Sequence, residues 1–162
     1  MGCASGAQRD AMEMKVTMIQ AYVYRRSADG DMSYLLLRRA TGERLYPGMW
    51  QMVTGRLEAG ERAVDAAKRE IFEETGLRVT ELTVVPYVAS FYFAPDDAVH
   101  HVPVFAAEAP TDFIIHLSVE HEDAAWLPFA EAHERLVFPG HREGLRTLRD
   151  YILSDIRARE DF

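Results

Sequence analysis

Three glutamates, Glu70, Glu73 and Glu74, have the residue type and spacing expected of carboxylate ligands that bind a metal ion together. In a helix that turns about 100° per residue, their carboxylates fall within an arc of about 100° on one face. Clustered carboxylates without cysteine or histidine are hard oxygen ligands, which favour Mg²⁺ or Mn²⁺ over zinc. An acidic helix face is also a common solvated surface, since like charges at this spacing cost only about 0.2–0.5 kcal/mol per pair. The flanking residues must decide between these readings.

The flanking residues favour a metal site. Gly55, Glu61 and Arg69 precede the glutamates at fixed offsets, and Gly76-Leu77 follow them. At average residue usage, a chance match to this set anywhere in the chain is rarer than about one in a million. The whole stretch, GRLEAGERAVDAAKREIFEETGL at residues 55–77, resembles the signature of the Nudix hydrolases. That resemblance implies a loop–helix–loop that binds divalent cations and cleaves nucleoside-diphosphate linkages. We call residues 55–77 the Nudix signature.

The resemblance implies ligands for Mg²⁺, with Mn²⁺ as a substitute. Glu70 and Glu74 would be the firmest ligands, and Glu73 a ligand or a catalytic base. The backbone carbonyl of Thr54 would be a further ligand, and an acidic residue from a later loop would join them. Bound cations would neutralise the phosphates of a substrate, polarise phosphorus and lower the pKa of the attacking water.

The other residues of the signature are expected to support the ligands. By resemblance Arg69 pairs with Glu61 and orients the metal carboxylates, although its guanidinium could instead contact phosphate. Gly55 suits a tight turn where the backbone approaches a metal or phosphate closely. Gly76 fits the left-handed C-terminal cap of a helix.

A second segment, Glu120-His121 followed by Trp126-Leu127, supplies the candidate for the acidic residue outside the signature. It resembles the matching segment of two subgroups, the dihydroneopterin or deoxyadenosine triphosphate pyrophosphatases and the diadenosine tetraphosphate hydrolases. By that resemblance Glu120 is a metal ligand or the general base. The neighbouring Glu122 and Asp123 are close enough in sequence to compete for this role.

Three further residues are candidates for substrate binding. Two arginines could bind phosphate: Arg38, at the end of a predicted strand, and Arg142, at the start of the last predicted helix. Both subgroups have an arginine in the segment that matches Arg142. Trp50 could stack on a base or a pterin, although a tryptophan beside a strand often belongs to the core. The run from Trp50 to Gly55 resembles the sequence that enters the signature of the triphosphate pyrophosphatases. The proline-lysine-glycine entry expected of the dinucleoside tetraphosphate enzymes is absent.

These resemblances predict a Mg²⁺-dependent hydrolase of phosphoric anhydride bonds in a nucleoside or pterin triphosphate, with a monophosphate and pyrophosphate as products. A diadenosine polyphosphate hydrolase is the close alternative. A nucleotide-sensing domain without catalysis is the second alternative, but such domains typically lose glutamates of the signature, and this chain has all of them.

The elements around these residues predict one α/β domain, an α/β/α sandwich with a mixed sheet and the Nudix fold. Ala63, Val64, Ala67 and Ile71 recur at helical spacing and predict a buried stripe on a helix that starts near Glu61. Strands are predicted before and after this helix, and two further helices close the chain. The predicted strands are 15–24, 33–38, 49–54, 79–93, 101–108, 113–117 and 124–127, and the late helices are 129–137 and 141–157.

The composition sets the outer limits. The chain of 162 residues fits one domain. We expect residues 1–13 to be a flexible leader, 14–158 the domain and 159–162 a tail. The formal net charge of −8 argues against non-specific binding of nucleic acid. With Cys3 as the single cysteine and no apolar run near the roughly 20 residues that span a bilayer, we expect a cytoplasmic protein that does not bind membranes. Its expected partner is a small molecule, and dimers among relatives make a homodimer an open expectation.

Overall fold

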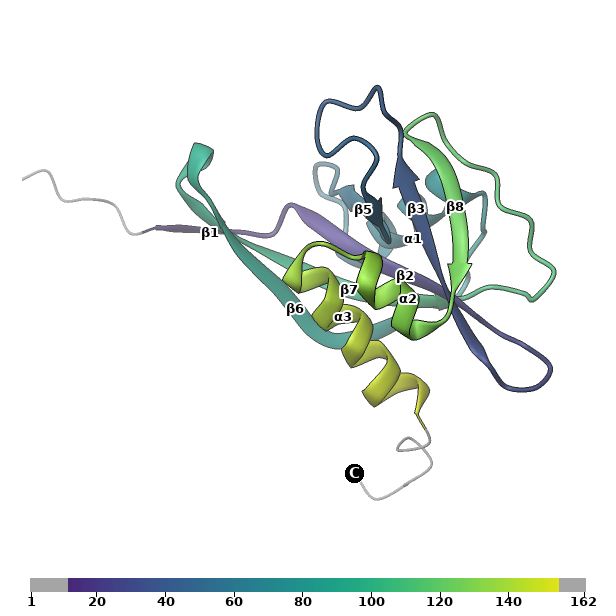
Figure 1. Cartoon of the computed structure of the whole chain (residues 1–162). Helices are drawn as coiled ribbons and strands as arrows, with labels where there is room; N and C mark the ends of the chain where they lie inside the picture. The colour runs from purple at the N-terminus through teal and green to yellow at the C-terminus, as the bar shows by residue number, and fades with distance from the viewer. Residues whose placement is uncertain (1–11, 155–162) are drawn as a thin grey trace, which may run out of the picture.

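Two long parallel strands, β2 (Met18–Arg26) and β7 (Ala98–Glu108), form the centre of an eight-stranded mixed sheet in the computed structural model, which describes residues 12–154 (Figure 1). β2 also pairs antiparallel with β3 and β5, while β7 pairs antiparallel with β6 and parallel with β1. β8 and β4 pair with β3. The other strands are β1 (Glu13–Lys15), β3 (Met32–Arg39), β4 (Trp50–Gln51), β5 (Val53–Arg56), β6 (Thr83–Phe93) and β8 (His121–Leu127).

The two faces of the sheet carry separate cores, because side chains of a strand alternate between faces. Ile19 and Val23 of β2 face α1 (Ala63–Thr75) and share a cluster with its Ile71. Tyr22, between them, lies in a second cluster with Leu145 of α3 (Pro139–Thr147). α2 (Phe129–Arg135) packs on the same face as α3, and a π-helical turn, Leu148–Leu153, continues α3. The predicted α/β/α sandwich is therefore confirmed.

Helix α1 is the predicted element that the structure reproduces most closely. Its stripe lies against the sheet, with Ala67 and Ile71 fully buried. Gly76 ends the helix in the left-handed conformation, at a φ of 78°, and its N–H donates to the carbonyl of Phe72. The predicted helix cap is confirmed. Since α1 is held along its apolar stripe, the glutamates beside that stripe keep fixed positions, and Glu74 is itself buried.

The predicted strand at residues 113–117 is wrong, because this segment has no regular structure. Phe113 and Ile115 pack against the core on the α1 side while Ile114 is exposed, and this alternation imitates a strand. The backbone hydrogen bonds go elsewhere: the N–H of His116 donates to the carbonyl of Thr75 at the end of α1, at 2.9 Å. The loop that connects β7 to β8 therefore passes the end of α1.

Other predicted boundaries need smaller corrections. The expected strand at 15–24 is two strands, with Val16-Thr17 between them, and Glu13, assigned to the leader, already belongs to β1. The last helix begins at Pro139 rather than His141, since proline is tolerated in a first turn. The rest of the predicted leader, the end of that helix and the tail lie outside the described residues. Within residues 12–154, no helix is long and apolar enough to cross a membrane.

Candidate active site

The side chain of Glu70 lies directly over the backbone of Gly55, where β5 approaches α1. A Cβ atom placed on Gly55 would be 2.0 Å from Cδ and 2.2 Å from Oε1 of Glu70. The φ of Gly55 is not in the left-handed region, so contact rather than backbone conformation excludes a larger residue here. The glycine therefore makes room for the carboxylate beside the strand.

Gly55→Ala is expected to displace the Glu70 carboxylate and to lower both divalent-cation affinity and turnover about tenfold or more. The carboxylate is the mobile end of a flexible side chain, so we expect the fold to survive. Isothermal titration with Mn²⁺ and a thermal melt would separate the two effects. Gly42→Ala is the matched control, because nothing lies within 4 Å of a Cβ at Gly42. Normal Mn²⁺ binding by Gly55→Ala would contradict this role of Gly55.

Arg69 is the centre of a network of carboxylates. Its Nε and Nη2 donate to the two carboxylate oxygens of Glu61, each at 2.9 Å, and Nη1 donates to Glu70 at 2.7 Å and to Glu73 at 3.2 Å. Nη2 also donates to the carbonyl of Arg56 at 2.8 Å. The hydrogen bonds from Arg69 lower the pKa of Glu61 to about 2. Arg69 thus joins the helix to β5 and holds Glu70 and Glu73, in the arrangement that the resemblance predicts.

Glu74 is the most buried glutamate of the signature, with 4% of its surface exposed. Burial raises the pKa of its carboxyl well above the usual range, and the charges of Glu70 and Glu120 raise it further. Arg39 and the backbone N–H of Thr54 act in the opposite direction. Within residues 12–154 its Oε2 has no hydrogen-bond partner. A buried, unpaired carboxylate oxygen among other acids is a position that a cation would stabilise.

Glu120 comes from the loop before β8 and reaches the same region. Burial raises the pKa of both Glu70 and Glu74, and the charge of Glu120 raises each further, while the side chain of Glu120 is exposed. The loop is fixed because the carbonyl of Glu120 accepts the N–H of Ala40 at 2.9 Å. The competing Glu122 points elsewhere and pairs with Arg38 at 2.6 Å. The structure therefore brings Glu120 within electrostatic range of the half-buried Glu70 and the buried Glu74.

The donor set fits a hard divalent cation. Glu70, Glu74 and Glu120 supply oxygens from two elements, and their mutual repulsion is what a Mg²⁺ or Mn²⁺ ion would relieve. Glu73, more exposed, lies one turn along the same helix face as Arg69. Among the described residues, no three acidic, histidine or cysteine side chains already stand close enough to enclose an ion. Glu70 in particular now accepts from Arg69.

The three predicted substrate-binding residues all have protein contacts. Arg38 pairs with Glu122, and Trp50 packs against the core on the α2 and α3 side with the guanidinium of Arg135 4.9 Å from its ring. Arg142 donates to the carbonyls of Leu136 and Glu134 at the end of α2. These contacts are with residues other than Glu70, Glu73, Glu74 and Glu120, and a role of the three residues in substrate binding stays a prediction.

Two buried polar residues beside the glutamates were not predicted. His121, whose side chain is 0% exposed, has Nε2 3.9 Å from Oε2 of Glu74. Gln51 lies 3.4 Å from the same nitrogen. Burial, followed by the charge of Arg39, lowers the pKa of His121 to about 4, so the imidazole is neutral at pH 7. The only sequence signal for His121 was its place next to Glu120.

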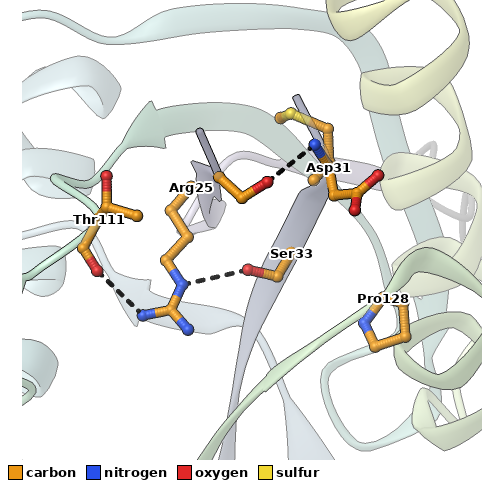
Figure 2. Close-up of a pocket in the computed structure, with 7 residues that line it drawn as sticks. Arg25, Asp31, Ser33, Thr111 and Pro128 are labelled. Carbon is orange, nitrogen blue, oxygen red and sulfur yellow. Dashed lines mark hydrogen bonds between the residues drawn. The ribbon is translucent and has the colours of Figure 1, made fainter. Parts of the chain in front are cut away.

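A separate cavity of about 320 Å³ lies at the other end of β3 (Figure 2). Arg25 lines it and donates to Oγ of Ser33 at 3.2 Å and to the carbonyl of Thr111 at 3.4 Å. Its guanidinium also lies 4.4 Å from the ring of Trp126. Met32 and Ser33, which line this cavity, begin β3, whereas Arg39, whose charge opposes the raised pKa of Glu74, ends it. The cavity is therefore not part of the glutamate site.

Family comparison agrees with this geometry. The NUDIX domain model matches residues 17–148, and the chain belongs to the Nudix family. Over 120 residues it is 41% identical to a protein named octanoyltransferase from Myxococcus xanthus, covering 72% of this chain and 32% of that protein. Over 55 residues it is 44% identical to the nucleoside triphosphatase NudI of Escherichia coli O139:H28, covering 33% of this chain and 39% of NudI. The chain thus spans less than half the length of these curated relatives.

Solved structures share the fold. The dihydroneopterin triphosphate pyrophosphohydrolase of E. coli matches with a TM-score of 0.70 at 24% identity, over 89% of this chain and 100% of that one. An Ap4A hydrolase of C. elegans matches with a TM-score of 0.68 at 23% identity, over 83% and 96%. At such identities the likeness establishes the fold and leaves the substrate open.

Proposed function

We propose that this protein is a Mg²⁺-dependent pyrophosphohydrolase that cleaves a nucleoside or pterin triphosphate to the monophosphate and pyrophosphate. The observation that carries the proposal is the buried Oε2 of Glu74, which has no hydrogen-bond partner within residues 12–154 and lies where the charges of Glu70 and Glu120 act on it. Membership of the Nudix family and the similarity to a protein named nucleoside triphosphatase support it.

In this proposal Glu70, Glu74 and Glu120 hold the cation, with the carbonyl of Thr54 and with Glu73 as further ligands. When bound, the cation neutralises the phosphates and lowers the pKa of a water molecule. Arg69 keeps Glu70 and Glu73 in place through its three carboxylate contacts. Either the exposed Glu120 or Glu73 is the group that accepts the proton of the attacking water at a carboxylate oxygen. Burial of Glu74 keeps bulk water away from that ligand.

A diadenosine polyphosphate hydrolase is the second candidate. The segment from Glu120-His121 to Trp126-Leu127 resembles that subgroup equally well, and the fold likeness to the C. elegans enzyme is nearly as close. A sensing domain without catalysis has less support, because all the glutamates of the signature are present.

A substrate comparison separates these candidates. With Mg²⁺ present, we expect release of pyrophosphate from dATP or dihydroneopterin triphosphate, at a kcat/KM at least tenfold above that for diadenosine tetraphosphate. Anion-exchange chromatography of the products gives both values. Cleavage of the dinucleotide alone would favour the second candidate. Binding of these nucleotides without turnover would favour the sensing domain.

A further inference from the structure

His121 lies in a buried polar cluster, and the proposed chemistry does not use its imidazole. Its Nε2 faces Oε2 of Glu74 at 3.9 Å and Nε2 of Gln51 at 3.4 Å, and Gln51 lies 3.5 Å from Oγ1 of Thr54. Within residues 12–154, neither Oε2 of Glu74 nor Nδ1 of His121 has a hydrogen-bond partner. Buried polar atoms are nearly always paired, so two unpaired ones in a single cluster require an explanation.

His121 is also linked to the glutamates through the backbone, because it directly follows Glu120. Glu120 precedes it at the start of β8, where side chains alternate, so Glu120 is exposed while His121 points inward. The loop before them is fixed to α1 where His116 donates to the carbonyl of Thr75. The imidazole beside Glu74 is a second point of approach between loop and helix. Where His121 sits therefore determines where Glu120 stands relative to Glu74.

We propose that His121 is a positioning residue for the metal centre: its Nε2 holds Oε2 of Glu74 and thereby sets the separation of the Glu74 and Glu120 carboxylates. The proposal rests on the proposed function only in taking these two residues as cation ligands. A carboxylate that gives one oxygen to a cation keeps the other for a protein donor. A movement of about 1 Å brings Nε2 and Oε2 within hydrogen-bond range. Gln51, whose amide nitrogen lies 3.4 Å from the same ring nitrogen, packs beside the imidazole and limits its rotation.

Two amide variants test the position of the donor. In His121→Gln the side-chain nitrogen can reach the place of Nε2, whereas in His121→Asn it reaches only the place of Nδ1. We expect His121→Asn to lower Mn²⁺ affinity about tenfold or more, and His121→Gln to stay within about threefold of the wild type. Titration of free Mn²⁺ by electron paramagnetic resonance, without substrate, gives the dissociation constants. Equal affinities in both variants, whether unchanged or equally reduced, would overturn the proposal.

His141→Asn is the matched control, because His141 is also a histidine with an unpaired, buried Nδ1 but packs against Phe138 on the α3 side. We expect a lower melting temperature and unchanged Mn²⁺ affinity.

If His121→Asn does not fold, Gln51→Leu decides: a loss of Mn²⁺ affinity is expected, and unchanged affinity overturns the proposal. Glu74→Gln in the same titration distinguishes failure of the proposed metal centre from failure of the positioning role. Normal Mn²⁺ binding by Glu74→Gln would contradict the metal centre itself. Weak Mn²⁺ binding by Glu74→Gln with normal binding by His121→Asn would contradict only the positioning role of His121.

Discussion

Glu74→Gln is expected to lower turnover by a factor of about 10³ or more while the protein stays folded. The amide keeps the size of the side chain but removes the charge that a cation requires of this ligand, and loss of an electrostatic contribution of this kind typically costs several kcal/mol in the transition state. Turnover of dATP with Mg²⁺, measured for wild type and variant at equal protein concentration, gives the ratio. Glu131→Gln on the exposed face of α2 is the control and should behave as the wild type. Undiminished turnover in Glu74→Gln would remove Glu74 from the site.

Without metal, Glu74→Gln is expected to make the protein more stable than the wild type as the pH rises. Burial and the charges of Glu70 and Glu120 raise the folded-state pKa of Glu74 above its unfolded value. The stability that this group contributes is therefore fully present below its unfolded pKa and is lost as pH rises through the folded pKa. In EDTA we expect the melting temperature of the wild type to fall relative to Glu74→Gln between about pH 5 and pH 8. Parallel melting curves over that range would contradict a raised pKa.

Arg69→Lys is expected to lower turnover by about 10- to 100-fold and stability by about 1–3 kcal/mol. The guanidinium contacts Glu61, Glu70 and Glu73 and a backbone carbonyl at the same time, and a single ammonium group cannot reproduce this forked geometry. Urea unfolding and steady-state kinetics measure the two losses.

Arg62→Lys is the matched control, since the side chain of Arg62 is exposed at the N-cap position of the same helix. It should leave both quantities within about a factor of two, or about 0.5 kcal/mol, of the wild type. If Arg69→Lys matches this control, the guanidinium network has no role in holding Glu70.

The parts of the site that lie on α1 could be predicted because helix geometry fixes the relative directions of nearby residues. Glu70, Glu73 and Glu74 share a face by spacing alone, and the apolar stripe that orients them is readable at Ala67 and Ile71. The α/β/α layering followed from the order of strands and helices in the same way. These features depend on residues close together in sequence.

The remaining features depend on contacts between distant segments. The approach of His121 to Glu74 and Gln51 joins three elements, and no local sequence pattern predicts it. Residues 113–117 alternate like a strand, yet the backbone of His116 pairs with the end of α1. Arg142 has the residue type of a phosphate ligand, but its guanidinium donates to the carbonyls at the end of α2. Composition shows which groups a side chain carries and not which partners it meets.

The most direct test of the central claim is a ³¹P spectrum of dATP treated with the protein in H₂¹⁸O, with Mg²⁺ and with EDTA in its place. We expect dAMP and pyrophosphate only in the Mg²⁺ sample, with the ¹⁸O-shifted resonance marking the phosphorus that water attacked. Equal hydrolysis in EDTA, or release of inorganic phosphate instead of pyrophosphate, would contradict a cation-dependent pyrophosphohydrolase built on Glu70, Glu74 and Glu120.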